Sequence, residues 1–309
     1  MIDTPKIIFW GTSDFAVPAL EILVKNGYKI AGVVTTPDEP KGRKLLLTPP
    51  PVKVAAGKHG LEIFQPEVLN SKTELPEADL FIVAAYGKII PKVILENPRL
   101  GALNIHPSLL PRWRGPSPIQ YAVLSGDRET GVTIMKIDEL MDHGPIIATS
   151  GKLQLTSKTT YKELHDKLAK IGAGLLVETL PKYLSGELKP IPQDDSKATF
   201  SKILTREDGR IDWSKSAEET QRMVQAFNPW PGVWTTWPSA KKIYRLKIDE
   251  AEVENKNADG QLGLVSAGLI VNTGKQGLKI TKLTLEGKKT MGADEFLQGY
   301  KNIIGQTLI

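Results

Sequence analysis

The chain has 309 residues, a formal net charge of +5 and no cysteine. Its length suits about two domains of ~150 residues each. The lack of cysteine excludes disulfides, zinc–thiolate sites and a thiol nucleophile, and four histidines do not favour a histidine-rich metal site, so we expect catalysis without a metal. The first residues lack the apolar run of a signal peptide, and no apolar run reaches the ~20 residues of a membrane span. We therefore expect a cytoplasmic protein with no membrane contact, and we infer no obligate protein partner.

The first half of the chain alternates apolar strands with helical sequence. We expect a helix over 17–26, ended by Gly27, and strands at 6–10, 30–35, 61–64, 80–84 and 102–105. Because the run 80–85 is apolar throughout, both faces of such strands should be buried. The pattern predicts an α/β fold with an open, mostly parallel, Rossmann-like sheet, whose ligands bind at the carboxyl ends of the strands.

The turn 11–14 after the first strand is not a dinucleotide-binding fingerprint. Thr12 and Ser13 stand where a second glycine would let a pyrophosphate approach the backbone. A helix N-cap by Ser13 or Asp14 is enough to explain the turn. We therefore exclude dinucleotide binding.

The segment 35–51 is long for a connection between a strand and a helix, which usually takes ~2 to 6 residues. Lys41, Arg43 and Lys44 are our candidates for contacts with nucleic-acid phosphates, and the leucines at 45–47 offer an apolar surface to a base pair. The alternative is a mobile surface loop. Basic residues also gather over 275–289; two basic stretches suit a long polyanion, although either one taken singly is more typical of solvated lysines.

Asn104 and His106 lie two residues apart at the end of an expected strand. Successive side chains of a strand alternate, so these two point to the same face. An amide that donates to a carbonyl oxygen and an imidazole that exchanges a proton near neutral pH suit attack on an acyl or formyl carbon. The alternative is structural: His106 caps the strand end and Asn104 satisfies a local turn.

Asp142 lies between expected strands at 132–137 and 146–149, and it is our candidate for the carboxylate that orients His106. A carboxylate in such a turn is often only a turn former. Asp138, Glu139 and His143 are rivals for the role, and we expect His143 to be a surface residue. The residue types and spacing do not decide between Asp142 and these rivals.

In the second half of the chain the regular alternation of strands and helices ends. An apolar stripe predicts a helix over 160–184 that ends at Pro181 or soon after. The proline-containing segment 190–199 is typical of a linker, with packing along the first domain as the alternative. A helix over 216–227 and short strands over 242–285 suggest a small barrel, of which an oligonucleotide-binding (OB-like) barrel is one candidate. We expect a catalytic domain over 1–189, a linker over 190–205 and a C-terminal domain over 206–309.

The segments 104–120, 131–134 and 142–145 resemble the 10-formyltetrahydrofolate-dependent formyltransferases. The resemblance implies the formyltransferase fold, 10-formyltetrahydrofolate as the formyl donor, and Asn104, His106 and Asp142 as the catalytic trio. It also implies that folate contacts the residues matching two motifs of this family, namely Tyr86, Gly87, Ile89, Ser108, Leu109, Leu110 and Pro111.

The resemblance extends nearly end to end for family members that act on methionyl-tRNA, through 9–15, 36–38, 42–43 and 226–234. It implies transfer to the free α-amine of initiator methionyl-tRNA, entry of the basic loop into the tRNA acceptor arm with Arg43 as the key contact, and an OB-like, tRNA-binding C-terminal domain. The chain departs from these members after Arg43, where many have a further glycine. Two alternatives stay open: a small amine acceptor such as an amino-sugar nucleotide, and a non-catalytic RNA-binding module, against which the segment 104–115 argues.

Overall fold

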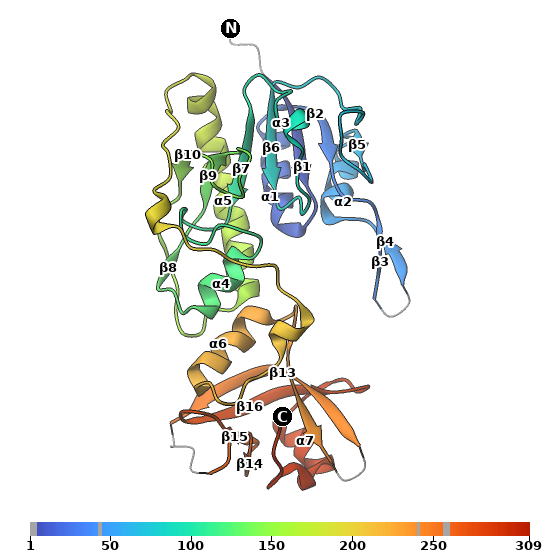
Figure 1. Cartoon of the computed structure of the whole chain (residues 1–309). Coiled ribbons are helices and arrows are strands. Elements are labelled where there is room, and N and C mark those ends of the chain that lie inside the picture. Colours follow the sequence, from blue (N-terminus) through green and yellow to red (C-terminus); the bar gives the residue numbers. More distant parts are fainter. Residues whose placement is uncertain (1–4, 43–44, 240–241, 256–259) are drawn as a thin grey trace. The chain divides into compact units, whose positions relative to one another are not determined.

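The computed structural model describes residues 5–42, 45–239, 242–255 and 260–309 (Figure 1). Its contacts divide the chain into two compact units. The first, here called the sheet unit, comprises Met1–Pro118, Glu129–Gln154 and His165–Lys202, and the second, the C-terminal unit, comprises Ile119–Arg128, Leu155–Leu164 and Ile203–Ile309. None of the helices in these described ranges combines the length and apolar character that a membrane crossing requires.

A seven-stranded sheet with the order β10-β9-β7-β6-β1-β2-β5 forms the centre of the sheet unit. The five strands from β7 to β5 pair in parallel, and β9 and β10 add antiparallel pairs at the other edge. The strands are β1 (Lys6–Gly11), β2 (Lys29–Val34), β5 (Ile63–Phe64), β6 (Leu80–Ala84), β7 (Ala102–His106), β9 (Thr133–Lys136) and β10 (Ile146–Thr149); β8 (Glu129–Thr130) pairs separately with β11 (Leu153–Gln154). The predicted open, mostly parallel sheet is confirmed.

The helices of this unit end near the breakers in the sequence. Helix α1 (Val17–Lys25) has a proline in its first turn and is followed by Gly27 at φ +75°, the usual asymmetry of helix ends. Helix α5 (Tyr161–Leu184) contains Pro181 and ends shortly after it, at Leu184. Ser13 takes the N-cap position of the short 3-10 helix η1 (Asp14–Ala16), but its side chain makes no capping hydrogen bond. The helices of the unit also include α2 (Pro51–Lys58), α3 (Lys92–Leu95), most of α5 (Tyr161–Leu184) and the 3-10 helix η2 (Asp195–Lys197).

The two faces of β7 have different partners. Leu103 and Ile105 are buried, and Ile105 faces α5 so closely that a Cβ on Gly172 would lie 2.8 Å from its Cγ2 atom. Glycine at 172 therefore allows the helix to pack on the strand. Asn104 and His106 point to the opposite face, because side chains alternate along a strand. Apolar packing on one face holds the polar pair on the other.

The segment 35–51 contains a hairpin of β3 (Glu39–Lys41) and β4 (Leu46–Thr48), where we expected a loop. The adjacent leucines Leu45, Leu46 and Leu47 expose 71%, 65% and 72% of their surface. At the base of the hairpin, Lys53 and Gln65 each donate to Asp38 over 2.8 Å, and these bonds, Gln65 first, lower the pKa of Asp38. Arg43 and Lys44 lie outside the described residues, as does the side chain of Lys41.

Residues 190–202, here called the strap, belong to the sheet unit. Ile191 exchanges backbone hydrogen bonds with Ile146 of β10. Further along, the backbone of Thr199 pairs with Pro111 and Arg114, and that of Ser201 pairs with Arg114. The expected linker thus packs along the first half of the chain, which was the stated alternative.

The C-terminal unit contains an antiparallel sheet with the order β12-β13-β16-β15-β14, and β17 pairs with β16. Among the described strands the two ends of this order do not pair, so the barrel is open, as an OB-like fold allows. Helix α6 begins at the predicted place with a capping box of Ser216 and Glu219. The elements are α4 (Pro118–Leu124), η3 (Arg206–Gly209), α6 (Ala217–Phe227), β12 (Val233–Pro238), β13 (Ile243–Glu254), β14 (Val265–Ser266), β15 (Ile270–Asn272), β16 (Gly277–Leu285), β17 (Thr290–Gly292), α7 (Ala293–Gly299) and η4 (Lys301–Ile303).

Candidate active site

Asn104, His106 and Asp142 meet at the carboxyl end of β7. The Asn104 Nδ2 atom donates to Oδ1 of Asp142 over 3.3 Å, and Nδ1 of His106 lies 3.6 Å from the same oxygen. The side chain of His106 is 4% exposed and that of Asp142 17%. Strand β7 supplies the first two residues, and the turn between β9 and β10 supplies the third. The structure thus brings together the three residues selected from the sequence.

Both ring nitrogens of His106 face oxygen acceptors. Nε2 lies 2.9 Å from the backbone oxygen of Trp113, so the Nε2–H group donates to that carbonyl. Nδ1 lies 3.6 Å from Oδ1 of Asp142, so the imidazole and the carboxylate are neighbours without a direct hydrogen bond. The hydrogen bond to Trp113 fixes the orientation of the ring, with its other nitrogen towards the carboxylate.

The turn that carries Asp142 has a narrowly defined backbone. Asp142 has φ +48°, a left-handed conformation that few residues other than glycine, asparagine and aspartate adopt. Its Oδ2 atom accepts a hydrogen bond of 2.8 Å from the backbone N–H of Gly115. At Gly144 a Cβ would lie 1.9 Å from the carbonyl oxygen of Lys136, so only glycine fits there.

The rivals of Asp142 have other partners. The His143 ring lies 2.6 Å from Asp138, and this hydrogen bond raises the pKa of His143. Glu139 pairs with Lys92. His143 is about one-third exposed, in line with the surface position expected for it. Among the described contacts, Asp142 is the carboxylate beside His106.

The segment from Ser108 to Pro111 lies against β9. Thr133 of β9 donates to the carbonyl of Ser108 over 2.7 Å and accepts from the N–H of Leu110 over 3.1 Å. The side chains of Ser108 and Leu110 are buried, whereas Leu109 and Pro111 are half-buried. A ligand on this segment would therefore meet Leu109, Pro111 and backbone.

The loop after β6 contains the other predicted folate residues. The side chain of Tyr86 is buried edge-on against Trp10, with ring centroids 5.2 Å apart, and burial raises its pKa to about 12. Gly87 has φ +85° and Ile89 is 84% exposed. Because β6 and β7 are neighbours, this loop borders the same sheet edge as the trio, where Ile89 offers apolar surface and Tyr86 faces the core.

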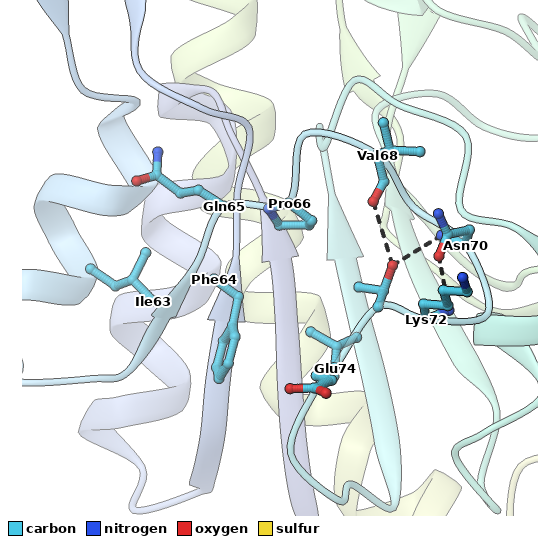
Figure 2. Close-up of a pocket in the computed structure, with 10 residues that line it drawn as sticks. Ile63, Phe64, Gln65, Pro66, Val68, Asn70, Lys72 and Glu74 are labelled. Carbon is cyan, nitrogen blue, oxygen red and sulfur yellow. Dashed lines mark hydrogen bonds between the residues drawn. The ribbon is translucent and has the colours of Figure 1, made fainter.

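A cavity of 490 Å³ lies elsewhere, beside β5 (Figure 2). Among the described residues, none of the polar trio lines it. Figure 2 shows that its wall is formed by the end of β5 and the segment that follows: Ile63, Phe64, Gln65, Pro66, Val68, Asn70, Lys72, Thr73, Glu74 and Leu75. We place the candidate active site at the trio, because there an amide and an imidazole lie within 3.6 Å of one carboxylate oxygen at the carboxyl end of a sheet strand. The described residues also contain no cluster of three His, Asp or Glu side chains arranged to hold a metal.

Sequence reasoning missed a buried arginine and two strap residues beside the trio. The side chain of Arg114 is 5% exposed and donates from Nη2 to Asp195 over 2.7 Å and from Nε to Gln193 over 3.0 Å. The bond to Arg114 lowers the pKa of Asp195. The only signal in the sequence was the change in composition over 190–199, which equally suits a linker.

Two protein-family models match the chain. The formyl transferase model matches residues 5–180, and the model of the formyl transferase C-terminal domain matches residues 203–301. The first match alone covers more than half of the chain, so the chain belongs to the formyl transferase family. The trio at the end of β7 lies within the first match and the open barrel within the second.

Relatives of nearly equal length are named methionyl-tRNA formyltransferase. The chain is 44% identical over 310 residues to the one of Bacillus pumilus (strain SAFR-032), covering 98% of this chain and 97% of the relative. It is also 44% identical over 301 residues to the one of Chloroflexus aurantiacus (strain ATCC 29366 / DSM 635 / J-10-fl), covering 95% and 96%. The similarity therefore includes both matched regions.

Solved structures share the fold at lower identity. WlaRD, a sugar 3N-formyl transferase solved in the presence of dTDP and 5-N-formyl-THF, has a TM-score of 0.66 at 19% identity, over 93% of this chain and 100% of that one. HypX from Aquifex aeolicus, solved with tetrahydrofolic acid, has a TM-score of 0.63 at 18% identity, over 98% of this chain. The chain spans about half the length of HypX, 48%.

Proposed function

We propose that this chain transfers the formyl group of 10-formyltetrahydrofolate to the free α-amine of initiator methionyl-tRNA, in the cytoplasm. The observation that carries the proposal is the convergence of Asn104, His106 and Asp142 at one sheet edge, in a chain similar along its whole length to proteins named for this activity. The folate donor is supported by HypX, which shares the fold and was solved in complex with tetrahydrofolic acid.

The site residues account for the transfer without a covalent enzyme intermediate. The amine nitrogen attacks the formyl carbon to give a tetrahedral oxyanion, and the bond from that carbon to the folate nitrogen then breaks. One N–H of the Asn104 amide donates to Asp142, and the other donates to the oxyanion. His106 stabilises the oxyanion electrostatically. Asp142 accepts the proton that the amine loses and passes it to the departing folate nitrogen, so the protons balance. Folate would lie along the loop with Gly87 and Ile89 and the segment with Leu109 and Pro111.

The hairpin 39–48 is the proposed contact for the tRNA acceptor end. Its exposed leucines offer apolar surface to an unpaired or terminal base, and Lys41, Arg43 and Lys44 would neutralise phosphates. The C-terminal unit is proposed as a second tRNA contact, because its open barrel and the lysines over 275–289 suit a polyanion.

A formylation assay with mixed acceptors tests the proposal. Purified protein, 10-formyltetrahydrofolate and a mixture of aminoacylated tRNAs are incubated, and the blocked α-amines are identified after release of the amino acids. We expect blocked methionine from the initiator tRNA alone. Transfer to an amino-sugar nucleotide, with none to tRNA, would contradict the proposal and favour the acceptor of WlaRD-like enzymes.

Salt dependence gives an independent measurement. Binding of tRNA should weaken by at least about tenfold between roughly 50 and 200 mM salt, because bound phosphates release counterions. Binding of a small amine acceptor should change much less. A nearly flat response for tRNA would contradict the role of the basic residues.

A further inference from the structure

We propose that Gln193 of the strap is a positioning residue for Asp142. The inference rests on the proposed function, because it concerns the same transfer. Gln193 lies 51 residues from Asp142 in the chain, and its side chain contacts the turn between β9 and β10. It holds the backbone of that turn and thereby the carboxylate beside His106.

The contacts of Gln193 use its whole amide group. Nε2 donates to the carbonyl of Asp142 over 2.9 Å and to that of Gly144 over 2.8 Å. Oε1 accepts from Nε of the buried Arg114 over 3.0 Å. Both acceptor carbonyls belong to one turn, so a single side chain fixes the backbone on either side of His143.

This turn needs such support because its conformation is unfavourable for the chain. Asp142 adopts φ +48°, and the backbone of Gly144 lies against the carbonyl of Lys136. A strained turn persists only when its surroundings determine it. Without the two donated hydrogen bonds, the turn can relax, and the Asp142 carboxylate moves with it.

Arg114 extends the same support to His106. Its guanidinium bonds Gln193 and Asp195 of the strap, while its neighbours Trp113 and Gly115 contact His106 Nε2 and Asp142 Oδ2 through their backbones. The strap therefore joins the two backbone segments that orient the imidazole and the carboxylate. Loss of Gln193 should affect the chemical step rather than substrate binding.

The first experiment separates kcat from KM. Gln193→Met keeps the side-chain length and removes the hydrogen-bonding groups, and we expect kcat to fall about tenfold to a hundredfold, as a small misplacement of a reacting group does. The KM values for donor and methionyl-tRNA should stay within about twofold. Lys197→Ala is the matched control, because this strap side chain is 75% exposed and pairs with Asp194; its kcat should stay within about twofold of the wild-type value.

A double-mutant cycle distinguishes positioning from a general structural effect. In an Asp142→Asn background, where the carboxylate is already lost, Gln193→Met should lower single-turnover rates by less than about twofold. Equal fold losses in both backgrounds, or a rise in KM with kcat unchanged, would overturn the inference. Failure of the wild-type protein to formylate methionyl-tRNA would instead overturn the proposed function.

A spectroscopic measurement covers the case in which activity falls through misfolding. The ¹⁵N resonances of the His106 ring should shift in Gln193→Met and stay in place in Lys197→Ala, while the melting temperature confirms that both proteins are folded. An unchanged His106 spectrum in a folded Gln193→Met protein would overturn the inference. Should this variant not fold, Gln193→Glu is measured in the same way, because its carboxylate cannot donate to the two carbonyls.

Discussion

The carboxyl end of β7 and the hairpin 39–48 are built in opposite ways. At β7 the side chains of Asn104, His106 and Asp142 are buried or half-buried, and each makes a hydrogen bond to another segment. Asp142, for example, accepts from the backbone N–H of Gly115. On the hairpin the leucines are exposed by 65–72%, and the described side-chain bonds to other segments lie at the base, on Asp38. The difference suggests a division of labour: a rigid edge for the chemical step and a projecting surface for a large acceptor.

Replacement of His106 tests the rigid edge and has the largest expected effect. His106→Ala removes the imidazole that faces both Trp113 and Asp142, so formyl transfer should fall by about 10²–10³-fold in kcat. Rapid-quench kinetics with saturating substrates measures it. His59→Ala, at an exposed histidine, is the control and should keep wild-type turnover. Near-normal turnover of a folded His106→Ala protein would exclude His106 from the chemical step.

Replacement of the hairpin leucines tests the projecting surface. The double change Leu46→Ser and Leu47→Ser should raise KM for methionyl-tRNA about tenfold, the equivalent of ~1.4 kcal/mol of lost apolar contact, and leave the melting temperature unchanged because both side chains are exposed. Val68→Ser, another exposed aliphatic position, serves as the control. If kcat falls while KM stays constant, the proposed division between the two regions is wrong.

The base of the hairpin should titrate in acid. The bonds from Gln65 and Lys53 lower the pKa of Asp38, so they favour the folded hairpin above the ordinary aspartate pKa of 3.8, and this contribution is lost as pH falls through the lower folded value. Amide exchange of Glu39, Lys41 and residues 46–48 should therefore speed up several-fold in acid, relative to β7. Asp38→Asn should show the faster exchange already at neutral pH. Equal exchange in both proteins would mean that Asp38 does not hold the hairpin.

Tyr86→Phe has the smallest expected effect. The hydroxyl is buried and has no hydrogen-bond partner among the described atoms, so its removal should change the free energy of unfolding by no more than about 1 kcal/mol and leave folate KM unchanged. Because the folded pKa is raised to about 12 from 10.0, Tyr86 costs stability as pH rises from 10 towards 12, and the variant should lose less stability there. Alkaline unfolding followed by circular dichroism measures this difference. A raised folate KM would mean that the phenol contacts the donor.

The fold was largely predictable from local pattern, and the site partly so. Apolar runs such as 80–84 mark strands buried on both faces, and the alternation at Asn104 and His106 correctly places both on one face. The hairpin was missed because its strands are short and its leucines are consecutive rather than alternating. Gln193 was missed because its contacts join residues 49–79 positions apart, which no local pattern encodes.

The contacts of the strap also determine where a truncated catalytic fragment of this protein should end. A fragment ending at 189, where composition changes, would lose Gln193, Asp195 and the backbone pairs of Thr199 and Ser201. A fragment ending after Lys202 would retain them all. Dissection of the catalytic half should therefore use the later end point, because a shorter fragment can keep every strand of the large sheet and still have a loosened Asp142 turn.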